Sequence, residues 1–157
     1  MTVAMVQRMN SVGTKLSQDH QQLAVLLECL SQAAEACDRE ALAATWAELE
    51  PRLIGHMDAE ERYLLPLVEA DHPAEVKRTL LEHAQIRDRL AELGLAIELH
   101  AVRCADIRAL TDLLQDHSKH EDEELYVLAG DKVSVAVEHG VVSTLRTALR
   151  SALRSAS

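Results

Sequence analysis

Two histidine–glutamate pairs with the same four-residue spacing could supply ligands to a metal site. His56 precedes Glu60 in the stretch HMDAEERYLLP, and His120 precedes Glu124 in HEDEELYVL. Residues four apart lie on the same face of an α-helix, separated by about 6 Å of helix rise. Imidazole nitrogens and carboxylate oxygens both bind transition metals. Each pair could therefore present two ligands from a single helix.

Two further histidines, His20 and His83, precede these pairs by nearly equal lengths of chain. Each follows an acid and begins an apolar stripe, in DHQQLAVLLECL and EHAQIRDRLAEL. Two hairpins of one design, packed face to face, would bring four imidazoles and two carboxylates into the core. A buried carboxylate is costly unless it is paired or binds a metal, and the inward stripes contain no Lys or Arg in register. The pattern predicts a two-metal centre, and mixed nitrogen and oxygen ligation with open positions suits iron better than magnesium or calcium.

Several neighbouring residues have more than one interpretation. His117 lies in the inward stripe one turn before His120 and could be a further ligand or a neighbour of the ligands. Tyr63, one turn after Glu60, could hydrogen-bond to the site or belong to the core. Glu121 is a minor ligand candidate within a solvated acidic run. Tyr126 lies off the strict stripe and is expected only to pack.

The elements that must position these residues are helices. The chain has 157 residues, five glycines and three prolines, and strong helix formers dominate it. We expect one all-α domain over residues 1–157, in which an antiparallel up-down-up-down four-helix bundle covers about 14–129. The expected helices are 11–36, 38–70 with a kink at Pro51, 74–100 and 104–129. An additional C-terminal helix is expected over about 131–156, where Gly140 could interrupt it.

Charge and composition exclude several classes of function. A net charge of −10 argues against nucleic acid and anionic membranes as partners. No apolar run approaches a membrane span, and the N-terminus lacks the apolar core of a signal peptide. Three cysteines without a CxxC motif indicate reduced core thiols and a cytoplasmic protein. Arg146, Arg150 and Arg154 form a stripe on the last helix, which is either a solvated face or a homodimer contact.

Together these residues resemble the hemerythrin-like, or HHE cation-binding, family. The matching residues, within about 14–129, are His20, His56-MDA-Glu60-ERYLLP, Glu82-His83 and His120-EDE-Glu124. The resemblance implies an up-down-up-down bundle that holds two non-haem iron ions, bridged by an oxo or hydroxo group and by Glu60 and Glu124. It also implies that His20 and His56 bind one iron, and that His83 and His120 bind the other.

One position departs from the family's oxygen carriers, which have an additional histidine one turn after the third-helix histidine. Arg87 occupies that position here, and arginine stays protonated and cannot bind a metal. The resemblance therefore favours an open iron site that reacts with oxygen, nitric oxide or peroxide, with an unknown electron donor, over reversible oxygen carriage. The alternatives are a module that senses oxygen or iron or stores iron without turnover, and a purely structural metal bundle.

Overall fold

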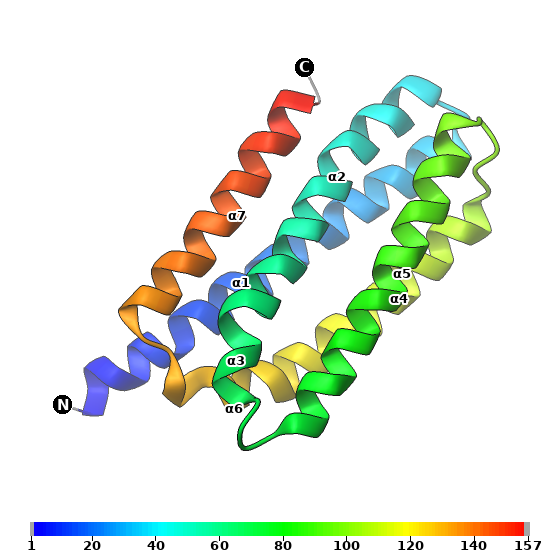
Figure 1. Cartoon of the computed structure of the whole chain (residues 1–157). Coiled ribbons are helices and arrows are strands. Elements are labelled where there is room, and N and C mark those ends of the chain that lie inside the picture. The colour runs from blue at the N-terminus through cyan, green and yellow to red at the C-terminus, as the bar shows by residue number, and fades with distance from the viewer. Residues whose placement is uncertain (1, 156–157) are drawn as a thin grey trace.

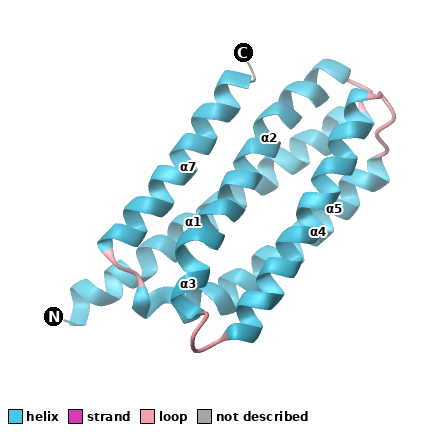
Figure 2. Ribbon diagram, in the orientation of Figure 1, coloured by secondary structure: helices cyan, strands magenta, loops and turns pink. Residues whose placement is uncertain are grey.

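The structure is a computed structural model that describes the backbone of residues 2–155 and the side chains of residues 11–155. Every regular element among these residues is a helix (Figures 1 and 2), so the all-α prediction is confirmed. The α-helices are α1 (Thr2–Glu35), α2 (Arg39–Ala59), α3 (Leu65–Val68), α4 (Pro73–Glu98), α5 (Cys104–His120), α6 (Tyr126–Ala129) and α7 (Val135–Ser155). α1 begins well before the expected start at residue 11, and the other expected helical stretches end within a few residues of their expected limits.

Successive long helices run in opposite directions along the molecule (Figure 1). α1 packs against α2 and α5, and α4 packs against the same two helices.

Local sequence explains where the helices begin. Asp38 is the N-cap of α2, where its side chain accepts a hydrogen bond from the backbone N–H of Ala41 at 3.0 Å. Pro73 is the first residue of α4, a position where its missing N–H costs nothing. Pro51 lies inside α2 without ending it.

Two separate apolar layers fill the interior. One layer lies toward the end of the bundle where α1 turns into α2 and α4 turns into α5, and it includes Leu30, Leu49, Ile86 and Leu110. The other lies toward the opposite end, and includes Leu16, Leu64, Val76 and Leu125. Along every bundle helix the predicted histidines and glutamates fall between residues of the first layer and residues of the second. Polar side chains therefore occupy a buried middle section between two apolar layers.

Two π-helical turns were not predicted from the sequence. The turn η1 (Glu60–Leu64) joins α2 to α3, and η2 (Glu121–Leu125) joins α5 to α6. A π-turn inserts an extra residue into an otherwise regular helix, and such turns are frequent at functional sites. Each turn here begins at a glutamate that lies four residues after a histidine. The two halves of the chain therefore share a backbone distortion as well as a sequence pattern.

The C-terminal helix α7 packs along α2 of the same chain (Figure 1). Gly55 permits this close approach, because a Cβ atom there would lie 2.3 Å from the Cβ of Ala148. The expected interruption at Gly140 is wrong, since α7 continues through it. Gly140 instead contacts the ring of Tyr63, and a Cβ at Gly140 would lie 2.3 Å from that ring. Tyr63 is thus part of the contact between α7 and the bundle.

The three cysteines are free thiols, but they are not core residues as expected. Cys29 and Cys37 are exposed and Cys104 is half-buried. Cys29 lies outside the inward stripe of α1, Cys37 lies in the turn after α1, and Cys104 is the first residue of α5. Within residues 2–155, no helix combines the length and the apolar character that crossing a membrane requires.

Candidate metal centre

Six buried side chains gather in the middle section of the bundle. They are His20, His56, Glu60, His83, His117 and Glu121. They come from α1, from α2 and η1, from α4, and from α5 and η2. Glu60, Glu121 and His83 have no solvent exposure, and the others are at most 9 % exposed. Such a set is stable only when its charges are mutually compensated or bind metal ions.

The donor atoms form two groups, each spanning less than 4.8 Å. His20 and His56 belong to the first group, His83 and His117 belong to the second, and Glu60 and Glu121 belong to both. Both glutamates can therefore bridge two metal ions, one in each group.

Each shared carboxylate divides its oxygens between the two groups. Glu60 Oε1 lies 3.2 Å from His56 Nε2, while Glu60 Oε2 lies 3.2 Å from His83 Nε2. Glu121 Oε2 lies 3.1 Å from His20 Nε2, while its Oε1 lies 2.9 Å from His117 Nε2. One oxygen toward each group is the arrangement that a bridging carboxylate needs.

The structure brings together four of the six expected ligands: His20, His56, Glu60 and His83. In the second half, His117 and Glu121 join this cluster in place of His120 and Glu124. The stretch HSKHEDEE contains both pairs at the same HxxxE spacing, so the motif alone did not distinguish them. A shift of three residues turns a helical side chain by roughly 60°. That rotation directs the later pair away from the centre, toward α4.

His120 and Glu124 form a separate set of contacts beside the cluster. His120 Nδ1 lies 2.8 Å from Glu82 Oε2, and its Nε2 lies 2.5 Å from Glu75 Oε1. Glu124 is exposed and pairs with Arg78 at 3.4 Å. The donor atoms of Glu75, His120 and Glu124 also lie within 4.8 Å of one another. The expected pair thus lies among acidic groups at the edge of the bundle.

Two cluster histidines, one in each hairpin, donate a hydrogen bond from Nδ1 to a carboxylate outside the cluster. Asp19 Oδ2 lies 2.7 Å from Nδ1 of His56, and Glu82 Oε2 lies 2.7 Å from Nδ1 of His117. Each of these acids immediately precedes a cluster histidine in the sequence. Because a carboxylate only accepts, Nδ1 carries a proton, and in the neutral form of each ring the lone pair of Nε2 is then available to a metal ion in the cluster.

The other two histidines are held by acids that immediately follow the shared glutamates. Glu61 Oε1 lies 2.8 Å from Nδ1 of His83, and Asp122 Oδ1 lies 3.3 Å from Nδ1 of His20. Hydrogen bonds that metal-binding histidines donate to carboxylates orient the rings and raise their basicity. One sequence signal could have identified these four acids: each is the immediate neighbour of a cluster residue. The four dipeptides are Asp19-His20, Glu60-Glu61, Glu82-His83 and Glu121-Asp122.

Strong electrostatic coupling ties the cluster together. Burial lowers the pKa of His83, but hydrogen bonds to Glu121 and Glu60 outweigh burial and raise the pKa to about 10. Burial likewise opposes the charged form of His56, yet the charge of Glu60 and the bond to Asp19 raise its pKa well above the usual value. Burial would raise the pKa of Glu121, but bonds to His117, His20 and His83 hold it well below the usual range. Protons and metal ions therefore compete for the same atoms.

Two buried atoms of the cluster lack hydrogen-bond partners, which indicates whether the cluster suits a metal ion. Glu60 Oε2 and His117 Nε2 have no hydrogen-bond partner of acceptable geometry, although each lies within ion-pair distance of another cluster atom. Leaving such groups unsatisfied costs about 1–3 kcal/mol each. A metal ion between the donors would satisfy both atoms, so the residues fit bound cations.

Three residues near the site have roles that the sequence did not assign. Tyr126, expected only to pack, places its hydroxyl among the donors of the first group and lies 2.5 Å from Glu60 Oε1. Arg87 does not approach the cluster donors, because its guanidinium binds Glu61 at 2.6 Å and Asp58 at 3.0 Å. Tyr63 packs against Gly140, as described above.

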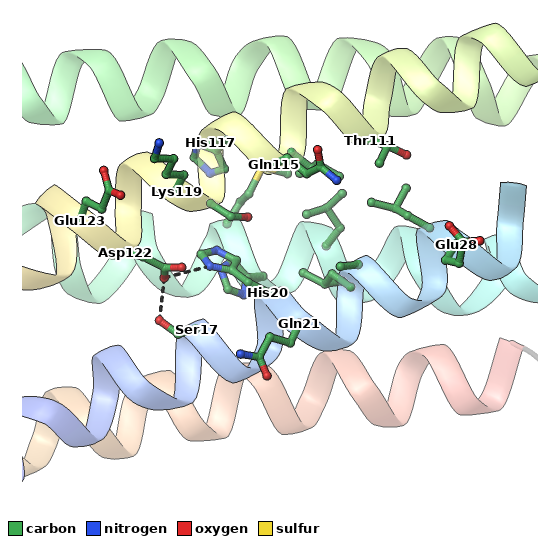
Figure 3. Close-up of a pocket in the computed structure, with 18 residues that line it drawn as sticks. Ser17, His20, Gln21, Glu28, Thr111, Gln115, His117, Lys119, Asp122 and Glu123 are labelled. Atoms are coloured by element: carbon green, nitrogen blue, oxygen red, sulfur yellow. Dashed lines mark hydrogen bonds and ion pairs between the residues drawn. The ribbon is translucent and has the colours of Figure 1, made fainter.

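A cavity of about 450 Å³ between α1 and α5 leads to the cluster (Figure 3). His20, His56 and His117 line it, and Leu23, Leu27, Leu53 and Leu114 form apolar walls. Polar side chains including Gln21, Gln115 and Lys119 also line it, as Figure 3 shows. Small molecules that enter this cavity can therefore reach the imidazoles of the cluster.

Fold and site define an all-helical protein whose core holds a His- and Glu-rich site for metal cations. The family model described as the hemerythrin HHE cation binding domain matches residues 13–129, most of the chain. The protein belongs to this family, as the resemblance in its sequence indicated. No curated protein and no solved structure matched the chain.

Proposed function

We propose that the protein is a non-haem di-iron protein that binds or reacts with small oxidants: oxygen, nitric oxide or peroxide. The observation that carries this proposal is the sharing of Glu60 and Glu121 between two groups of donors. His20 and His56 would hold one iron, and His83 and His117 the other, with both glutamates and an oxo or hydroxo group between the irons. The proposal includes the up-down-up-down bundle of this family as the scaffold.

Iron, when bound, would supply the electrons and the open coordination position that an oxidant requires. The protein's own side chains prepare the site for this chemistry. Carboxylates on the outer nitrogens of the histidines fix each ring, and their negative charge favours the ferric state over the ferrous state. The apolar layers on both sides exclude water from the cluster, which strengthens its electrostatic interactions.

The cavity between α1 and α5 provides the route for a small guest. Its apolar walls and the imidazoles that line it suit uncharged oxidants such as oxygen, nitric oxide and hydrogen peroxide. Arg87 in place of a fifth histidine supports reaction over reversible oxygen carriage, because the second iron would have only His83 and His117 as nitrogen ligands. An electron donor would reduce the pair after each reaction, and a homodimer through α7 and a cytoplasmic location remain part of the proposal.

The test combines metal analysis with rapid mixing. Anaerobic iron loading should give about two iron ions per chain, and stopped-flow spectra should then show whether the ferrous protein reacts with oxygen, nitric oxide or peroxide. One iron or none would contradict the dinuclear centre. A long-lived oxygen adduct that returns to the ferrous state when oxygen is removed would favour sensing or carriage, and slow iron release without turnover would favour storage.

A further inference from the structure

The hydroxyl of Tyr126 occupies a distinctive place in the cluster. Its Oη lies 2.5 Å from Glu60 Oε1, 3.2 Å from His20 Nε2, 3.3 Å from Glu121 Oε2 and 3.4 Å from His56 Nε2. These four atoms are the donors of the first group. One phenol oxygen thus contacts every donor that a metal at the first position would use.

Spacing among these atoms resembles the spacing of ligands around one metal ion. With metal–ligand bonds of about 2.1 Å, two ligands at right angles lie about 3 Å apart. Pairs within the first group lie at 3.1 Å, for His20 and Glu121, and at 3.2 Å, for His56 and Glu60. The distances from Tyr126 Oη fall around the same value. A hydrogen bond to Glu60 alone would not require the hydroxyl to approach both imidazoles.

The π-turn η2 explains why this tyrosine reaches the centre. Tyr126 follows Glu121 by five residues, which in a regular α-helix would turn the two side chains far apart. A π-turn closes with five-residue spacing, so Glu121 and Tyr126 return to nearly the same face. The related turn η1 places Leu65 five residues after Glu60, and Leu65 is a buried apolar residue. Only one half of the site therefore receives a phenol.

We propose that Tyr126 is a metal ligand at the first position and makes the two metal positions unequal. The first position would have five protein donors, from His20, His56, Glu60, Glu121 and Tyr126. The second would have four, from His83, His117, Glu60 and Glu121. Exogenous molecules would then bind at the second position, beside His117, because the cavity between α1 and α5 is lined by His117 as well as by His20 and His56. This inference rests on the proposed iron pair.

The experiment uses the fact that the chain has only two tyrosines, Tyr63 and Tyr126. Ferric protein should show a visible phenolate-to-iron charge-transfer band, and resonance Raman spectra excited in that band should show tyrosine ring modes. Tyr126→Phe should abolish the band and the ring modes, while the control Tyr63→Phe, which removes a hydroxyl at the α7 contact, should keep both. Elemental analysis of all three proteins gives the bound iron, so that the band and the ring modes are compared per iron ion.

The outcomes separate this inference from the proposed function. Iron bound by the native protein without tyrosine ring modes, or modes that persist in Tyr126→Phe, would overturn the assignment of Tyr126 alone. A protein that binds no iron would overturn both. Azide titration of the ferric protein checks the asymmetry: the native protein should take up one azide per chain and Tyr126→Phe should take up a second. Two azides on the native protein would show that the positions are equally open.

Discussion

The guanidinium of Arg87 lies 2.6 Å from Glu61, the carboxylate that holds the Nδ1 of His83. Arg87 therefore influences the second metal position indirectly, through Glu61 and His83, and its guanidinium does not occupy a ligand position. Burial would raise the pKa of Glu61, but the bonds to Arg87 and His83 lower it. The positive charge draws part of the electron density of Glu61 away from the histidine, which makes His83 a weaker donor.

Replacing Arg87 with Met should therefore change the reduction potential and leave the iron content at about two per chain. Removal of a nearby positive charge favours ferric iron, so the potential should fall, by an amount on the order of tens of millivolts. A mediated redox titration measures this shift. Arg89→Met is the control, because Arg89 lies on the same helix and pairs with exposed Glu92. A rise in potential, or the same fall in both variants, would contradict the argument.

Metal analysis of paired variants decides between the two overlapping HxxxE pairs. Glu121→Ala should reduce bound metal from about two ions to less than one per chain, because Glu121 is shared by both donor groups. Glu124→Ala should leave the metal content unchanged, because Glu124 is exposed and pairs with Arg78. In a second pair of variants, His117→Ala should likewise lose bound metal and His120→Ala should keep it. Equal losses from Glu121→Ala and Glu124→Ala would contradict this assignment, and a larger loss from Glu124→Ala would favour the pair expected from the sequence.

The sequence predicted much of this architecture for identifiable reasons. The spacing of apolar residues and the residues that typically begin or end helices predicted the helices, since Asp38, Pro73 and Gly130 lie at or near helix ends. The first half of the site came together as expected because HMDAE contains one histidine at the required spacing. The second half contains His117 and His120 within one turn, and both begin an HxxxE. Choosing between them needs the rotation of the helix relative to α4, which is a property of packing.

Tyr126 could not be placed from the sequence because its position depends on the π-turn η2. A regular helical period moves it off the inward stripe, and no local residue preference announces the extra residue. The acids that hold the histidines were visible as DH, EH, EE and ED. Their partners were not visible, because Glu61 and Asp122 bind histidines that lie on other helices.

The metal-free protein should lose stability as the pH rises from about 6.5 to about 10. Hydrogen bonds to Glu121 and Glu60 raise the pKa of folded His83 from 6.5 to about 10. A group whose pKa is higher in the folded state stabilises fully below its unfolded pKa and loses that contribution as the pH rises through the folded value. Melting temperatures of chelator-treated protein between pH 6 and pH 10, roughly the range of these pKa values, provide the measurement.

Metal should reverse this pH dependence over the neutral range. Bound metal replaces the protons of the cluster, so the metal-loaded protein should melt at a higher temperature than the metal-free protein, by more at higher pH. His139→Gln, an exposed histidine in α7, is the control and should keep the slope of the native protein. A flat metal-free profile would mean that His83 is not protonated in the folded cluster.

The close packing of α7 on α2 predicts a specific pair of substitutions. Gly55→Ala should destabilise the protein by about 1–3 kcal/mol, because the new Cβ would lie 2.3 Å from Ala148 Cβ. Ala148→Gly removes that atom and should recover part of the loss in the double variant, although glycine in a helix costs up to about 1 kcal/mol. Urea unfolding of the four proteins completes a double-mutant cycle. Additive effects would mean that α7 does not lie against Gly55 in solution.

Access through the cavity between α1 and α5 should limit the reaction with peroxide. Ala24 is exposed on α1 and lines this cavity without belonging to the donor groups. Ala24→Trp should fill part of the cavity and slow the reaction of the ferrous protein with hydrogen peroxide by about tenfold or more, equivalent to about 1.4 kcal/mol. Iron content should not change. Val25→Trp is the matched control, because Val25 is 57 % exposed on the same helix and does not line the cavity. If both variants react at the native rate, peroxide reaches the centre by another path; if both react slowly, the effect is on the helix and not on the cavity.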